Sequence, residues 1–169
     1  AVRPLAVSHA FHSPLMAGAA APLRQAAGRI GFAPPRIAWI SDLTGGPAEH
    51  VNADYWVEHM LSTVRFADGF AELRRRGCDA FVEIGPHPTL LNLCRSTVAR
   101  QGGADGEPGR LLWLPSLSRK GGGRRTFLQS LGRLHCSGGE VDWSGLDGRA
   151  TAARVPVPHL PMERDRYWF

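Results

Sequence analysis

The order of strand-like and helix-like segments in the middle of the chain most constrains the fold. Residues 36–41 and 80–84 are short runs rich in β-formers, and residues 111–118 form a further candidate strand. Helix-prone segments lie between them, including residues 67–76 and 89–100. Strands that alternate with helices in this way are typical of a parallel sheet with helices on its faces. The sequence therefore predicts an α/β fold.

Capping and turn residues place the elements that precede this region. An alanine-rich helix over residues 15–29, with proline in its first turn, should follow a short strand over residues 2–8. Asn52 or Asp54 can cap the next helix, which should end near residue 61. Both helices carry apolar side chains that can pack against the body of the domain.

Glycines and prolines divide the chain into two parts. The run Gly121-Gly122-Gly123 marks a boundary, which we place between a domain over residues 1–119 and a linker over residues 120–169. The linker should hold one amphipathic helix and a short strand at residues 141–143. After residue 150 its prolines favour an extended strap, which needs a neighbour to lie on.

Charge and cysteine content limit the kinds of binding partner and the cellular compartment that we expect for this chain. The net charge of +5 favours acidic partners, but the runs Arg74-Arg75-Arg76 and Arg124-Arg125 lack interleaved aromatics, so solvated helix faces are favoured over a nucleic-acid site. No apolar run approaches the roughly 20 residues that span a membrane. The three cysteines show no Cys-x-x-Cys pairing. They are expected to be reduced, half-buried thiols in a cytoplasmic protein.

Two histidines and two serines lie within an otherwise apolar stretch at residues 7–16. His12 is a natural place for proton transfer, because imidazole titrates close to neutral pH. The alternative is that His9 and His12 are structural residues of a turn. Their His-x-x-His spacing lacks a second close pair of ligands, so the sequence predicts no metal site.

Four segments in order resemble the acyltransferase domains of modular type I polyketide synthases, which are related to malonyl-CoA:acyl-carrier-protein transacylases. They are Val7-Ser8-His9-Ala10-Phe11-His12-Ser13 with Pro14-Leu15-Met16; Asp54-Tyr55-Trp56-Val57-Glu58-His59-Met60 with Thr63-Val64-Arg65-Phe66; Phe81-Val82-Glu83-Ile84-Gly85-Pro86-His87-Pro88; and Leu160-Pro161 with Arg164-Asp165-Arg166-Tyr167-Trp168. The resemblance implies the C-terminal part of an α/β-hydrolase-like large subdomain, followed by the post-acyltransferase linker. We therefore expect the chain to be a fragment of a larger domain.

The resemblance also implies roles for three histidines. His12 would be the general base of a Ser/His pair, and the backbone carbonyl of His59 would orient it. His87 would be structural, in a turn stiffened by prolines. The nucleophilic serine of the family lies in a Gly-x-Ser-x-Gly elbow, and none of the ten serines here has that context. We expect the isolated chain to be inactive.

The residues before His12 imply the substrate. His9, Ala10 and Phe11 resemble the segment of malonyl-selective relatives, in which Phe11 would fill the space of an α-methyl group. The implied partners are malonyl-CoA, the phosphopantetheine thiol of an acyl carrier protein, and the ketosynthase with its adjoining linker. No cofactor is expected to bind to this part. The competing interpretation is a non-catalytic module that docks on a synthase.

Overall fold

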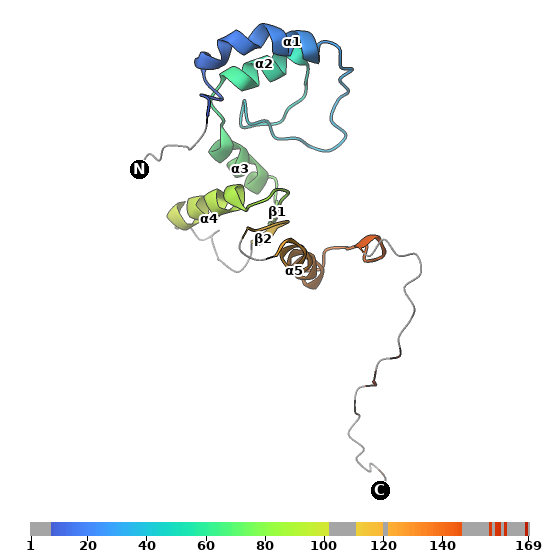
Figure 1. The fold of residues 1–169 in the computed structure, drawn as a ribbon. Coiled ribbons are helices and arrows are strands. Elements are labelled where there is room, and N and C mark those ends of the chain that lie inside the picture. The colour runs from blue at the N-terminus through green and yellow to red at the C-terminus, as the bar shows by residue number, and fades with distance from the viewer. Residues whose placement is uncertain are drawn as a thin grey trace.

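The computed structural model describes residues 8–101, 111–119 and 122–146, and the single positions 156, 158, 159, 161 and 168 (Figure 1). The expected strand at residues 2–8 and the Pro-rich strap after residue 150 lie almost wholly outside the described residues. Among the helices that are described, none is long and apolar enough to cross a membrane.

Three helices form the N-terminal layer: the 3-10 helix η1 (Pro14–Ala19), α1 (Ala20–Ala27) and α2 (Ala53–Leu61). The predicted helix over residues 15–29 thus begins as a 3-10 helix. α1 and α2 lie side by side at the top of Figure 1, and their buried residues are Ala27 and Val57. Of the two candidate caps for α2, the structure selects Asn52, whose side-chain oxygen accepts from the Tyr55 amide at 2.8 Å.

Residues 36–41 do not form the expected strand. Only Ile40 makes a bridge, an isolated antiparallel one to Pro47. The chain instead turns back on itself, and the Ser41 amide donates to the Gly46 carbonyl at 2.8 Å. Residues with high β-propensity extend into a strand only where a neighbour can receive their hydrogen bonds. Here the tight turn provides a hydrogen-bonding partner only near Ile40, so residues 36–41 form no continuous strand.

The C-terminal layer confirms the predicted α/β class. Its elements are α3 (Phe66–Arg75), β1 (Ala80–Glu83), α4 (Thr89–Gln101), β2 (Leu112–Pro115), α5 (Gly123–Cys136) and the 3-10 helix η2 (Ser144–Leu146). Within the described residues, β1 and β2 form a two-stranded parallel sheet, with Phe81 opposite Trp113. In Figure 1, α3 leads from the α1–α2 pair down to this sheet. The N-terminal and C-terminal layers are therefore joined by one helix.

Side chains on both sides of the sheet make its core. The rings of Phe81 and Trp113 stack at 5.3 Å, and Phe70 of α3 packs against Phe81 at 5.2 Å. Leu114 of β2 is only 1% exposed. α5 packs on β2, and its Ser130 hydroxyl donates to a β2 carbonyl at 2.8 Å. The helix expected to open the linker therefore lies directly against the sheet.

Two smaller expectations are wrong. Residues 141–143 do not form a strand, because the chain bends there into η2, where Asp142 accepts from the backbone and side chain of Ser144. The cysteines are free thiols, but they are not uniformly half-buried: Cys78 is, Cys94 is buried and Cys136 is exposed at the end of α5. Burial and the nearby carboxylate of Glu83 raise the pKa of the Cys94 thiol to about 11, so that thiol is protonated.

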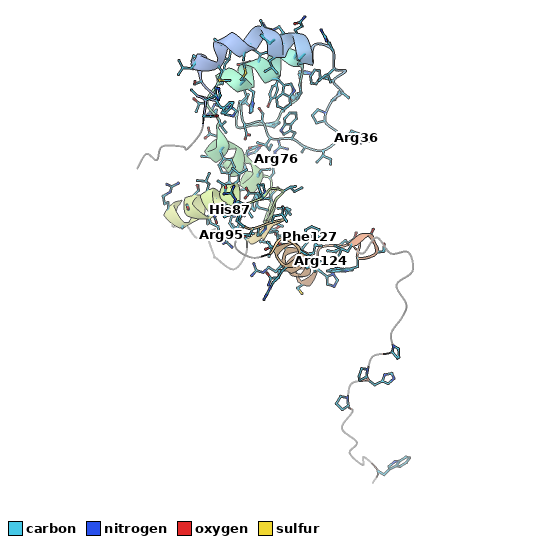
Figure 2. The ribbon with its side chains drawn as sticks, viewed as in Figure 1. Arg36, Arg76, His87, Arg95, Arg124 and Phe127 are labelled. Atoms are coloured by element: carbon cyan, nitrogen blue, oxygen red, sulfur yellow. The ribbon has the colours of Figure 1, made fainter. Side chains whose placement is uncertain are left out.

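The basic side chains are spread over several elements. Figure 2 shows Arg36, Arg76, Arg95 and Arg124 on separate parts of the chain. Arg75 and Arg76 bind the Glu72 carboxylate at 2.7 Å, which lowers the pKa of that carboxyl to about 2. These arginines therefore neutralise an acid of their own helix.

Glu83 connects β1 to α4. Its carboxylate oxygens accept from the backbone amides of Leu90 at 3.1 Å and Leu91 at 2.9 Å, in the first turn of the helix. Amides in the first turn of a helix have no partner within the helix, and negative charge is favoured at that end. The carboxylate therefore serves as the cap of α4.

We expect Glu83→Ala to lower the free energy of unfolding by about 1–3 kcal/mol, because two amides lose a charged acceptor. Glu83→Gln should cost less, since its amide oxygen can still accept. Glu58→Ala, on the exposed face of α2, is the control and should change stability by less than about 0.5 kcal/mol. Urea denaturation of the three variants measures the difference. Equal stability of Glu83→Ala and Glu58→Ala would contradict the cap.

Candidate active site

His12 lies in a tight turn just before η1. Its φ angle is +57°, and it is the only non-glycine residue in the described part of the chain with a positive φ. The Ser13 hydroxyl donates to the Ala10 carbonyl at 2.7 Å and accepts from the Leu15 amide at 3.3 Å, so one side chain closes the turn and caps η1. A left-handed backbone costs most residues roughly 1–3 kcal/mol and is found preferentially at functional sites.

The imidazole of His12 is held by a backbone group. Its Nδ1 donates to the carbonyl oxygen of His59 at 3.0 Å. A carbonyl oxygen can only accept, so Nδ1 must carry the proton. In the neutral ring the lone pair then lies on Nε2. The arrangement leaves His12 able to accept a proton at Nε2.

The His59 carbonyl is available because α2 ends two residues later. Its partner in a longer helix would be the amide of Thr63, but the helix stops at Leu61 and Ser62 is extended, with φ −104° and ψ 154°. The last four carbonyls of a helix lack partners within it, and they carry partial negative charge. His12 Nδ1 therefore donates to one of the carbonyls that the end of α2 leaves without a partner in the helix.

Aromatic side chains surround this hydrogen bond. The His59 ring meets the His12 ring edge-on at 5.0 Å and stacks on Tyr55 at 6.0 Å. The Tyr55 hydroxyl is hydrogen-bonded to the buried Ser41 hydroxyl at 2.8 Å, which ties α2 to the turn after Ile40. Packing from two segments therefore restricts the ring that contacts His12.

A cavity of about 440 Å³ opens beside His12. Its lining is almost wholly apolar and comes from the turn, α1, α2 and the segment after α1; it includes Phe11, Leu23, Ile30, Phe32, Trp56 and Met60. Trp56 and Met60 line this cavity but were not predicted as site residues. The helical spacing i, i+3, i+4 of Trp56, His59 and Met60 was the signal that could have found them. The imidazole of His12 therefore lies at an apolar cavity.

Of the other candidate residues, Phe11 lines this cavity, and His9, Ala10 and His87 do not. His9, Ala10 and Phe11 are exposed, and Phe11, at 53% exposure, lines the cavity. The His9 and Phe11 rings lie 5.7 Å apart, and the His9 Nδ1 is hydrogen-bonded to the Ser8 hydroxyl. His87 is exposed in the turn between β1 and α4, on a different layer (Figure 2). No three His, Cys, Asp or Glu side chains of the described ranges gather to hold a metal ion.

Comparison with known proteins identifies the family. The sequence matches the acyl transferase domain family over residues 1–141. The chain belongs to this family. Polyketide synthase GfsB of Streptomyces halstedii is 36% identical over 178 residues, covering 98% of this chain and 3% of GfsB. Erythronolide synthase EryA2 of Saccharopolyspora erythraea is 33% identical over 170 residues, covering 99% of the chain and 5% of that synthase.

Solved acyltransferase domains share the fold. The acyltransferase domain from the second module of the salinomycin polyketide synthase superposes with a TM-score of 0.77 and 36% identity, over 91% of this chain and 35% of that one. Malonyl CoA-acyl carrier protein transacylase from Clostridium perfringens superposes with a TM-score of 0.64 at 18% identity, over 79% of this chain and 38% of that one, which shows the fold alone. This chain thus spans about a third of the solved domains, and its expected α/β fold class is confirmed for the described residues.

Proposed function

We propose that this chain supplies the general base and the selectivity segment of an acyltransferase. The complete domain would move a malonyl group from malonyl-CoA to the phosphopantetheine thiol of an acyl carrier protein. The observation that carries the proposal is the hydrogen bond from His12 Nδ1 to the His59 carbonyl, which leaves Nε2 as a proton acceptor beside an apolar cavity. Membership of the acyl transferase family supports the reaction class.

In the proposed reaction a serine from another part of the domain attacks the malonyl thioester. His12 Nε2 takes the serine proton, the acyl C–S bond breaks, and the coenzyme A thiolate leaves with the proton that the imidazolium returns. In the second half the phosphopantetheine thiol gives its proton to His12 and attacks the malonyl-serine ester. The acyl C–O bond then breaks, and the serine oxygen recovers that proton from the imidazolium. The imidazolium exists in both halves, and in each its Nδ1–H would keep the hydrogen bond to the His59 carbonyl.

The serine must come from outside this chain, because none of its ten serines lies in a Gly-x-Ser-x-Gly sequence. We therefore propose that the chain alone is inactive. Residues 120–169 would form the linker toward the ketosynthase, since residues 160–168 resemble the end of that linker in the family. The proposed site requires no bound cofactor.

Reconstitution tests the function. The whole chain is combined with a polypeptide that holds the serine-bearing remainder of an acyltransferase domain, and transfer of labelled malonyl to a carrier protein is followed. We expect transfer by the complex and no gain of mass when the chain alone is incubated with malonyl-CoA. An assembled complex without transfer would favour the docking module instead. Malonylation of the chain alone would contradict the assigned division of the site.

The position of Phe11 at the cavity supports malonyl selection. We expect His9→Tyr together with Phe11→Ser, in the assembled domain, to raise use of methylmalonyl-CoA relative to malonyl-CoA, because the phenyl ring no longer fills the space of the α-methyl group. One methyl group in a pocket is worth about 1–3 kcal/mol, or about 10- to 200-fold in kcat/KM. A competition assay with both thioesters measures the ratio. Leu15→Ser, exposed on η1, is the control, and an unchanged ratio in the double variant would contradict the assignment.

A further inference from the structure

The imidazole of His12 makes two contacts with one residue. Its Nδ1 donates to the His59 carbonyl at 3.0 Å, and the two rings meet edge to face, with centroids 5.0 Å apart and 84° between their planes. The torsion that turns a histidine ring about its bond to Cβ is broad, so one hydrogen bond defines the ring plane only weakly. The contact with a second ring limits that rotation. The carbonyl and the ring of His59 together therefore set the direction of His12 Nε2.

Tyr55 in turn restrains the His59 ring. The two residues are four apart in α2, so their side chains lie on one face of the helix. Their rings stack with centroids 6.0 Å apart and 17° between the planes, within the range of offset aromatic pairs. Trp56 meets both rings edge-on, at 5.3 Å from Tyr55 and 5.8 Å from His59. The His59 ring therefore contacts three other aromatic rings, which limit its rotation.

A buried turn holds the far end of the Tyr55 side chain. The Tyr55 hydroxyl is hydrogen-bonded at 2.8 Å to the hydroxyl of Ser41, which is 1% exposed. The Ser41 hydroxyl oxygen also accepts from the Leu43 amide at 3.0 Å. The backbone amide and carbonyl of Ser41 bind Gly46 and Gly45, each at 2.8 Å. Tyr55 is therefore anchored to a residue whose side chain and backbone are all hydrogen-bonded.

We propose that Tyr55 is a positioning residue for the general base: through the His59 ring, it holds the His12 imidazole in the Nδ1–H tautomer and fixes the direction of Nε2. Proton transfer needs a base within hydrogen-bond reach, and a misplacement of about 1 Å can cost about 100-fold in rate. Tyr55 does not line the cavity beside His12, so its effect should be on orientation and not on substrate binding. The inference rests on the proposed role of His12 as the base.

Nitrogen NMR of the whole chain tests the tautomer without a substrate. The histidines are labelled with ¹⁵N, spectra are recorded at alkaline pH, where imidazole is neutral, and the signal missing from His12→Ala identifies His12. We expect the Nδ1–H tautomer in the unmodified chain and a mixture of both tautomers in Tyr55→Leu, which lacks the stacked ring. Tyr55→Phe should keep the tautomer. Val57→Ala is the matched control and should also keep it, since Val57 is buried in α2 but is absent from these ring contacts and from the cavity lining.

Kinetics of the assembled domain test the consequence for the reaction. We expect Tyr55→Leu to lower the saturating rate of malonyl-enzyme formation by about 100-fold, at an unchanged half-saturating concentration of malonyl-CoA. Tyr55→Phe keeps the ring and loses one hydrogen bond, so it should lose less than about tenfold. His59→Ala keeps its backbone carbonyl and should resemble Tyr55→Leu. The two changes together should cost little more than either alone, because both remove one contact to His12.

Circular dichroism shows whether each variant remains folded, and His59→Ala provides the test if Tyr55→Leu does not fold. A mixture of tautomers in the unmodified chain, an unchanged tautomer in the folded variants, or equal rates for Tyr55→Leu and Val57→Ala would overturn the inference. So would a raised half-saturating concentration at an unchanged saturating rate, since Tyr55 would then act on substrate binding. A tautomer that depends on Tyr55, in a complex without malonyl transfer, would count only against the proposed function.

Discussion

Malonyl transfer by the assembled domain is expected to fall by about 100- to 10,000-fold when His12 is replaced by alanine. The reason lies in the hydrogen bond from Nδ1 to the His59 carbonyl, which leaves Nε2 as the only ring nitrogen that can take the serine proton. Without the imidazole the serine hydroxyl stays protonated at neutral pH and is a weak nucleophile. Single-turnover formation of the malonyl-enzyme measures this loss directly.

The matched control is His87→Ala, which removes an exposed imidazole from the turn after β1. We expect that variant to retain transfer, because His87 is absent from the cavity lining and the hydrogen bonds around His12. The amount of complex must be equal for both variants, so that a loss reports chemistry and not assembly. Retention of full activity by His12→Ala would refute its role as the base.

Gly45→Ala should lower the free energy of unfolding by about 2 kcal/mol or more. Gly45 has φ +74°, where a Cβ is unfavourable, and an added Cβ would lie 2.5 Å from the Cβ of Asp68 in the first turn of α3. Relief of the clash would displace either α3 or the turn that carries Ser41. Since the Ser41 hydroxyl binds Tyr55, which stacks on His59, the disturbance should also reach the cavity beside His12.

Gly132→Ala is a control that should raise the free energy of unfolding, whereas Gly45→Ala should lower it. Gly132 lies inside α5, and a methyl group added to it would meet nothing within 4 Å apart from the backbone of its own helix. Alanine should therefore stabilise the helix by about 0.5–1 kcal/mol. Thermal and urea denaturation compare the two glycine variants. Equal stability of both would show that neither the positive φ nor the contact with Asp68 matters.

Local signals predicted several elements well. Asn52, one of the two residues predicted as possible caps, caps α2. The strand β1 lies within the predicted run of residues 80–84, and α4 begins at Thr89, after the Gly-Pro-His-Pro turn. Each of these depends on residues close in sequence, such as a capping side chain or a proline that excludes a helix. The segment around His12 was also identified from the sequence, and the structure brings His12 and His59 together across 47 residues.

The failures share a physical cause. Residues 36–41 have the composition of a strand, but a strand needs a partner, and the partner available was a turn of the same segment. The strand predicted for residues 141–143 is also absent, because the chain bends there into η2. The local sequence determines which backbone conformation a segment prefers. It does not determine whether a neighbouring strand lies where it can accept the segment's backbone hydrogen bonds.

The residues of this chain alone specify its helices, the β1 strand and an imidazole able to act as a base. Tertiary structure decides how that imidazole can act. The left-handed backbone of His12 and the end of α2 at Leu61 together bring Nδ1 to the His59 carbonyl, and packing of α1 on α2 leaves the apolar cavity beside it. These features arise from segments far apart in the sequence, so no local pattern could encode the tautomer or the cavity.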